Sequence, residues 1–172
     1  MDEEQKVGVT RIGRWMIFLA WTAVITLMTL LFTEVLDRRH NPNQNITTRY
    51  DGETKEVVLK SSRYGHYVAS GEINNMPVVF FVDTGASFVS VPEKIAKRLK
   101  LKKGFSYQTS TAAGTVTVYE TMLDEVSVGD ITLYNVKASI NPHNPEDEIL
   151  LGMSFLRRLE VTHKDGQLTI RQ

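Results

Sequence analysis

Residues 80–91 read Phe-Phe-Val-Asp-Thr-Gly-Ala-Ser-Phe-Val-Ser-Val, and this stretch decides the fold. An apolar run typical of a buried strand ends in an acidic residue, Asp83, and a second apolar run begins at Phe88. Asp and Gly are both common in plain turns between strands, so the triplet Asp83-Thr84-Gly85 is modest evidence when taken alone. The rest of the chain decides whether Asp83 is a turn residue or a catalytic one.

The residues around this stretch have the pattern of a small β domain. Short apolar runs separated by turn residues occur at Tyr67–Ala69, Met76–Val82, Phe88–Val91, Val116–Val118 and Val126–Val128. Hairpin signals occur at Asn74-Asn75, Gly129-Asp130 and Asp165-Gly166. Helical patterns are limited to Pro92–Leu101 and Met153–Leu159. The sequence therefore predicts an all-β fold, a small closed barrel with one or two short helices.

Two further elements make the pattern specific. The apolar-apolar-Gly element Ile149-Leu150-Leu151-Gly152 follows later in the chain, and Tyr107–Val116 lies between it and Asp83 with the composition of a hairpin. With these elements in this order, residues 63–172 resemble the retropepsin-like aspartic peptidases, and most closely their membrane-anchored bacterial members. The resemblance implies a retropepsin-like barrel and hydrolysis of peptide bonds.

The resemblance also assigns roles to residues. Asp83 becomes the catalytic carboxylate, Thr84 braces two active-site loops against each other, and Gly85 lets backbone amides approach the carboxylates. Leu150, Leu151 and Gly152 support this loop as the second element. The flap over the substrate comprises Thr109, Ser110, Thr111, Ala112, Ala113, Gly114 and Thr115, where Gly114 can supply a positive φ.

Ala86 bears on the pH dependence. Two-lobed pepsin-type enzymes often carry Ser or Thr at this place, and that hydroxyl favours the ionised form of an active-site carboxylate. Because Ala86 has no hydroxyl, the sequence predicts a pH optimum less acid than that of pepsin.

The chain contains one Asp-Thr-Gly triplet, and this predicts a dimer. Peptide hydrolysis by this chemistry needs a carboxylate that takes a proton from the attacking water and a carboxylic acid that hydrogen-bonds the carbonyl oxygen. The pairs Asp51-Gly52 and Asp165-Gly166 lack the hydroxyl residue and the preceding apolar strand. We therefore expect the second carboxylate to be the Asp83 of a second copy, with one proton shared by the pair.

Composition argues against several other functions. The chain has no cysteine, which excludes thiolate nucleophiles and sulfur-ligated zinc. Ser87 and Ser90 lie near Asp83 but lack the base and orienting acid of a serine hydrolase. The charges balance, with 20 Lys and Arg against 20 Asp and Glu, so nucleic acid is a poor partner. We expect no metal or cofactor, because the four histidines are scattered without metal-ligand spacing. They are His40, His66, His143 and His163.

A membrane segment is predicted near the N-terminus. Residues 15–32 contain no ionisable side chain and, as a helix rising about 1.5 Å per residue, nearly span a hydrocarbon core. A cleaved secretory signal would end in small residues, which residues 31–36 do not offer. We therefore predict a cytoplasmic tail over residues 1–14 and a signal anchor over 15–33. The flanking charges nearly balance, with Lys6, Arg11 and Arg14 on one side and Arg38, Arg39 and Arg49 on the other, but a short tail with Arg11 and Arg14 against the membrane favours an exported C-terminal domain. The resemblance to bacterial members implies the inner membrane, with this domain in the periplasm or at the cell exterior.

Residues 34–62 are polar and rich in turn residues, with Val57–Leu59 as a short apolar run, and they predict a linker that could end in a strand before a peptidase domain over 63–172. Within this linker, Glu56–Lys60 is an extended and accessible segment at which the enzyme could process itself, as related enzymes often do. In the anchor, one helix stripe carries hydroxyls and is a candidate self-association face: Thr22, Thr26, Thr29 and Thr33. The alternative is that each hydroxyl bonds to its own helix one turn back.

The leading hypothesis is a membrane-anchored homodimeric aspartic endopeptidase with an Asp83/Asp83 dyad and a polypeptide substrate. The alternative is a catalytically silent member of the same fold that holds a peptide or protein without cutting it, because a fold alone does not secure activity. The intact Asp83-Thr84-Gly85 triplet favours the enzyme.

Overall fold

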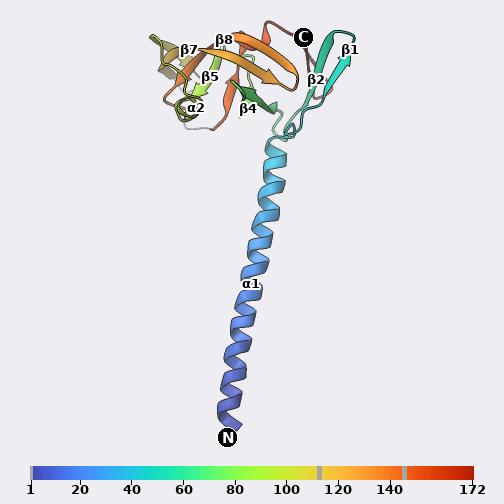
Figure 1. Ribbon diagram of the computed structural model, residues 1–172, viewed down its shortest axis with the longest axis vertical. Coiled ribbons are helices and arrows are strands. Elements are labelled where there is room, and N and C mark those ends of the chain that lie inside the picture. Colours follow the sequence, from blue (N-terminus) through green and yellow to red (C-terminus); the bar gives the residue numbers. More distant parts are fainter. Residues whose placement is uncertain (1, 112–113, 145–146) are drawn as a thin grey trace. The chain divides into compact units, whose positions relative to one another are not determined.

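The computed structural model describes residues 2–111, 114–144 and 147–172. The chain forms two compact units, Met1–Arg39 and His40–Gln172, which are described separately. Figure 1 shows a long helix, α1, in the first unit and a set of strands in the second. The predicted division into an apolar helix and a β domain is therefore present.

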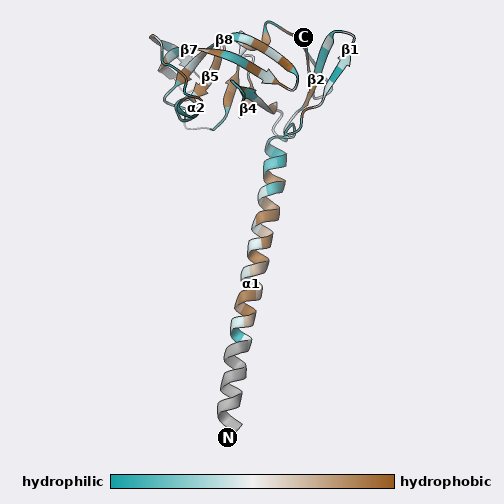
Figure 2. Ribbon diagram, viewed as in Figure 1, coloured by the Kyte–Doolittle hydropathy of each residue, from teal (hydrophilic) through white to brown (hydrophobic). Residues whose placement is uncertain are grey.

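Helix α1 (Asp2–His40) could span a membrane, because Gly13–His40 is long and apolar enough to do so. Figure 2 shows the apolar middle of α1 and the polar residues that follow it. The large apolar side chains between Trp15 and Leu36 are exposed within the unit. The helix therefore has the composition of a segment that needs an apolar surrounding.

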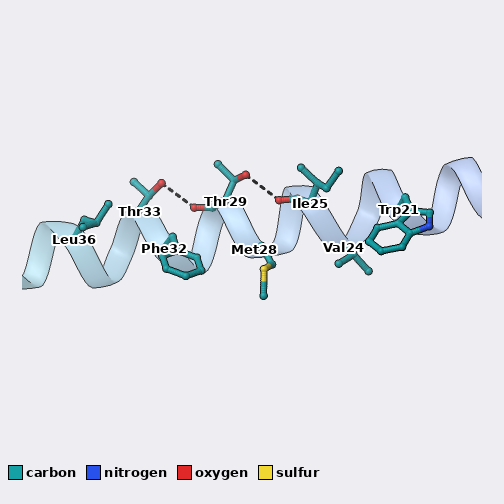
Figure 3. Close-up of a pocket in the computed structure, with 8 residues that line it drawn as sticks. All are labelled: Trp21, Val24, Ile25, Met28, Thr29, Phe32, Thr33 and Leu36. Atoms are coloured by element: carbon teal, nitrogen blue, oxygen red, sulfur yellow. Dashed lines mark hydrogen bonds between the residues drawn. The ribbon is translucent and has the colours of Figure 1, made fainter.

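The four threonine hydroxyls of the predicted stripe in α1 bond within the helix. The hydroxyls of Thr22 and Thr26 donate to the carbonyls of Phe18 and Thr22 at 2.9 and 2.8 Å. Thr29 and Thr33 donate to Ile25 and Thr29 at 2.8 Å each (Figure 3). This is the intrahelical alternative, and it leaves only acceptor lone pairs for a second helix.

The barrel is a sheet that closes on itself. Its strand order is β3 (Val68–Ile73), β4 (Met76–Val82), β9 (Ile149–Leu151), β5 (Val89–Pro92), β8 (Ile131–Asn141) and β7 (Gly114–Val128). A pairing of β3 with β7 completes the ring, and β6 (Ser106–Thr111) pairs with the projecting part of β7. Unexposed side chains from most of the ring fill the centre, among them Ile73, Phe80, Val89, Ile140 and Leu151. The predicted closed barrel is confirmed.

The turn positions predicted from the sequence agree with the structure, whereas the predicted lengths of strands and helices agree less well. Asn74 and Asn75 have φ of 50° and 60°, and Asp165 and Gly166 have 51° and 71°, as two-residue hairpin turns require. The helices are shorter than predicted, α2 covering Glu93–Arg98 and α3 covering Met153–Leu156. The runs at residues 116–118 and 126–128 belong to one long strand, β7, because Thr121, Met122 and Leu123 between them pair with β8.

The predicted linker over residues 34–62 is folded in its second half. Strands β1 (Thr48–Asp51) and β2 (Thr54–Lys60) join β11 (Gln167–Arg171) and β10 (Glu160–Lys164) in a four-stranded sheet. β2 lies between β1 and β11, and Val57 and Leu59 are fully buried in the core. Glu56–Lys60 is therefore not an accessible segment, and the folded domain begins before residue 63. The apolar run Val57–Leu59 indicates the strand, but three apolar residues do not show that it belongs to the folded domain.

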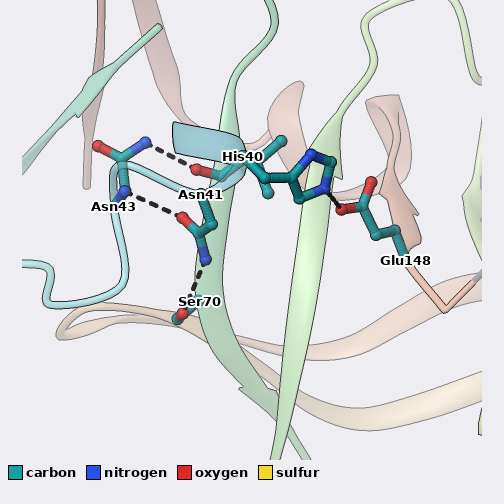
Figure 4. A network of polar contacts seen from close by, with 6 residues as sticks. His40, Asn41, Asn43, Ser70 and Glu148 are labelled. Carbon is teal, nitrogen blue, oxygen red and sulfur yellow. Dashed lines mark hydrogen bonds and ion pairs between the residues drawn. The ribbon is translucent and has the colours of Figure 1, made fainter. Parts of the chain in front are cut away.

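The chain between α1 and β1 is tied to the barrel by polar side chains. Buried Asn43 accepts the Lys60 N–H at its Oδ1 (2.7 Å) and donates Nδ2 to the carbonyls of Lys60 (2.9 Å) and Val68 (2.7 Å). Asn41 donates to the Ser70 hydroxyl at 3.1 Å, and His40 pairs with Glu148 (Figure 4). This segment is part of the domain.

Candidate active site

Asp83 directly follows β4, and the backbone fixes its position. Its N–H donates to the carbonyl of Leu151 in β9 at 3.2 Å, and its own carbonyl accepts the Ala86 N–H at 3.3 Å. Its carboxylate Oδ1 accepts the Gly85 N–H at 2.8 Å. Asp83 is half-buried, whereas Thr84 and Gly85 are exposed. The loop therefore presents one carboxylate oxygen held by a backbone donor at an open surface.

Gly152 brings the second predicted element against this loop. A Cβ at position 152 would lie 2.3 Å from the carbonyl oxygen of Phe88 and 2.7 Å from that of Ala86, so no larger residue fits without a backbone shift. The next residue, Met153, donates its N–H to the Ala86 carbonyl at 2.8 Å. The corner between β9 and α3 therefore cradles the loop that holds Asp83, and it brings Leu151 and Gly152 beside that loop.

Alternation along β4 and β9 separates a core face from a face shared with Asp83. Val78 and Phe80 in β4 are buried, and the residues with the parity of Asp83, including Phe81, are half-buried. In β9, Leu151 is buried and Leu150, which lies opposite Phe81 in parallel register, is half-buried. Phe81 and Leu150 therefore form an apolar wall beside Asp83. The sequence analysis did not assign Phe81 to the wall, although the period of two counted back from Asp83 could have found it.

The predicted flap is a hairpin. Thr109 and Ser110 lie in β6, Thr111 ends it, and Gly114 and Thr115 begin β7; Ala112 and Ala113 lie outside the described residues. Gly114 has φ of 115°, the positive value that the sequence predicts, and its carbonyl accepts the Thr111 hydroxyl at 2.8 Å. One face carries the half-buried Tyr107, Thr109 and Val116, and the other is exposed and polar. Between residues 106–111 and 114–118, the hydrogen bonds run within the hairpin.

Other polar groups serve the fold. Within the described ranges, no three His, Asp or Glu side chains lie together as they would to hold a metal ion. Lys103 hydrogen-bonds Glu93 and lowers the pKa of that carboxyl, and the same lysine lies 4.4 Å from the centre of the Tyr119 ring. These contacts fix the segment between α2 and β6. Asp83 and the backbone around it are therefore the candidate catalytic groups of this loop.

Sequence comparison finds a family and two curated proteins that this chain is similar to. Residues 69–158 match the family described as gag-polyprotein putative aspartyl protease. An uncharacterised protein encoded in the cobV 5′ region of Sinorhizobium sp is 34% identical over 119 residues, 67% of this chain and 51% of that protein. An uncharacterised protein of Rickettsia prowazekii (strain Madrid E) is 32% identical over 127 residues, 71% of this chain and 53% of that protein. The chain thus spans about half the length of these curated relatives.

Structural comparison finds a similar fold in a solved protein. The crystal structure of a retropepsin-like aspartic protease from Rickettsia conorii superposes with a TM-score of 0.56 at 25% sequence identity. The similarity covers 74% of this chain and 94% of that one. The shared region is therefore larger than the segment that the family sequence match covers.

Proposed function

The chain belongs to the gag-polyprotein aspartyl protease family and has the retropepsin-like fold, and on this premise we propose that it is a membrane-anchored aspartic endopeptidase that works as a homodimer. One observation carries the proposal. Asp83 ends a barrel strand, is half-buried, and accepts a hydrogen bond from Gly85 in a loop cradled by Gly152. The chain thus supplies one carboxylate oriented by a backbone N–H, and the reaction needs two carboxyl groups.

The second carboxylate comes from the Asp83 of a second copy. Two carboxylates a few ångströms apart cannot both ionise, so they hold one proton between them. The ionised member takes a proton from water as the water attacks the peptide carbonyl, and the protonated member hydrogen-bonds the carbonyl oxygen. The Gly85 N–H keeps one oxygen of Asp83 oriented throughout. Thr84 is exposed, as a residue that braces the two loops across a dimer axis would be in a single chain.

The flap and the membrane helix complete the proposal. The β6–β7 hairpin folds over an extended peptide, with Thr109 and Val116 on the half-buried face toward it. α1 anchors the enzyme in the inner membrane of a bacterial cell with the barrel on the periplasmic side, and confinement to a plane raises the concentration of partners. Self-processing inside Glu56–Lys60 would require β2 to leave its sheet, since Val57 and Leu59 are buried there.

Cleavage of an unfolded protein by the full chain in detergent micelles tests the proposal. Wild type is expected to cleave casein with a rate that rises faster than linearly with enzyme concentration, because the dimer is the active species. Asp83→Asn is expected to abolish cleavage. The matched control is Asp165→Asn, which changes another Asp-Gly turn at φ of 51°, a conformation that Asn also adopts. Peptide binding without cleavage by wild type would instead support the silent binding module.

A further inference from the structure

His66 lies beside the candidate site, and the sequence alone does not show this position. β3 and β4 are antiparallel, with Val68 opposite Phe81. The ladder continues one residue beyond the assigned end of β3, because the Val82 N–H donates to the Tyr67 carbonyl at 2.8 Å. The next pair in this register is His66 and Asp83. Residues directly opposite in an antiparallel pair have Cα atoms about 4.5–5.5 Å apart and side chains on the same face.

The ring of His66 confirms which face it occupies. Its centroid lies 5.0 Å from that of Phe81, at an angle of 45° between the ring planes. Phe81 precedes Asp83 by two residues, so both lie on the face of β4 opposite to the buried Phe80. His66 therefore stands at the edge of the wall formed by Phe81 and Leu150, on the side of the sheet that carries the catalytic carboxylate.

The loop before β3 holds His66 in place. The Ser62 N–H donates to the His66 carbonyl at 2.7 Å, and the Gly65 N–H donates to the Ser62 carbonyl at 3.0 Å, with Gly65 at φ of 79°. The backbone of His66 is thus fixed on both sides, by Ser62 and by the Tyr67 bond to Val82. Its side chain is exposed, and Arg63 in the same loop adds positive charge nearby.

We propose that His66 is a specificity-determining residue that selects glutamate, or another side chain with an apolar stem and an acceptor head, at the substrate position that packs on Phe81. The methylene groups of such a side chain cover the phenyl ring, and its carboxylate accepts a hydrogen bond from the imidazole N–H. The loop before β3 contributes two basic side chains here, His66 and Arg63, and the Asp83 carboxylate on the same face already accepts the Gly85 N–H, so the group bound at His66 is acidic rather than basic. The inference rests on the proposed peptidase function.

The test compares two peptides with the full chain in detergent micelles. A proteome-derived peptide library, prepared with a lysine-specific protease, first gives a cleaved sequence with Glu within three residues of the scissile bond. That peptide and its Glu→Leu twin are then assayed with wild type, His66→Ala and His66→Gln. We expect His66→Ala to lower kcat/KM for the Glu peptide about tenfold, through KM, and to leave the Leu peptide nearly unchanged. His66→Gln, which keeps an N–H donor, restores part of the preference.

The matched control is His163→Ala. The ring of His163 also packs on an aromatic side chain, at 5.6 Å from the Tyr67 ring, but it belongs to β10 in the four-stranded sheet. Its removal is expected to leave the Glu/Leu ratio unchanged. Three results would overturn the proposal. His66→Ala could lower kcat/KM equally for both peptides, or His163→Ala could change the Glu/Leu ratio as much as His66→Ala does. The library could also show no enrichment of acidic residues near the cleaved bonds.

Binding separates this inference from the proposed catalysis. Fluorescence anisotropy on Asp83→Asn, with and without His66→Ala, needs no turnover. Its Glu peptide is chosen from the same library by retention on immobilised Asp83→Asn, and its twin carries Leu in place of Glu. A selective loss of Glu-peptide binding in the double variant supports the role of His66 even if wild type cleaves nothing. An unchanged ratio of the two affinities removes it even if wild type is an active peptidase.

Discussion

Two hairpins extend the barrel, and they are held in opposite ways. The β1–β2 hairpin is bonded to other elements along its length: the Tyr50 hydroxyl donates to Asp130 at 2.7 Å, Lys55 Nζ donates to the Asp130 carbonyl at 2.9 Å, and Asp130 N–H donates to Thr48 at 2.9 Å. The Asp130 contact also raises the pKa of Tyr50, since the ionised phenol would meet a carboxylate. The β6–β7 hairpin is attached at its base, where Tyr119 and Glu120 of β7 pair with Ile140 and Ser139 of β8.

The difference separates structural and functional parts of the chain. The hairpin that the sequence assigns to a linker carries core residues, and the hairpin assigned to the flap keeps its distal hydrogen bonds within itself. A segment with few bonds to the remaining fold opens at low free-energy cost. The β6–β7 hairpin can therefore move for substrate entry, and the β1–β2 hairpin cannot move without opening the core.

Truncation gives the largest expected effect. A chain starting at residue 40 keeps β1 and β2, and we expect it to fold and to unfold cooperatively. A chain starting at residue 63 loses Val57 and Leu59 and exposes Leu168 and Ile170. Each fully buried side chain of this size contributes about 1.5–3 kcal/mol, and the whole free energy of unfolding of a domain is about 5–15 kcal/mol. We therefore expect the shorter chain to be unfolded or aggregated.

Circular dichroism and thermal melting of the two truncated chains make this measurement. The chain from residue 40 serves as the control, because it lacks α1 as the shorter chain does. Equal melting temperatures for the two chains would show that β1 and β2 are only a peripheral addition.

Asn43 gives the next effect. Asn43→Ala removes three hydrogen bonds and leaves the Lys60 N–H and the carbonyls of Lys60 and Val68 without their partner. A buried group without a partner costs about 1–3 kcal/mol, so we expect a loss of about 3 kcal/mol in the free energy of unfolding. Urea denaturation of the chain from residue 40 measures it. Asn45→Ala, at an exposed position nearby, is the control and should change little; equal losses at both positions would contradict the role given to Asn43.

The sequence predicts the site better than it predicts the boundary of the domain. Asp83, Gly85 and Gly152 form a pattern that the backbone requires, since Gly152 packs against two carbonyl oxygens and no Cβ fits. Asn43 carries no such signal, because Asn-Pro-Asn is typical of turns and its amide bonds strands far along the chain. His66 carries no such signal either, because the four histidines are scattered along the sequence. Its place opposite Asp83 depends on the register of β3 and β4, which no local pattern states.

Gly114 gives the smallest effect on stability and tests the mobile side of the comparison. Gly114→Ala places a Cβ at φ of 115°, where side chains are strained by about 1–3 kcal/mol. Because the distal bonds of the hairpin stay within it, the strain is relieved by local opening, and we expect a loss of about 1 kcal/mol or less in unfolding free energy. Cleavage of casein should nevertheless fall several-fold, because the tip conformation changes. Thr117→Ala, at an exposed position of β7 outside the predicted flap residues, is the control. A stability loss as large as that of Asn43→Ala would mean that both hairpins are equally integrated into the fold, and it would remove the basis for treating β6–β7 as the moving part.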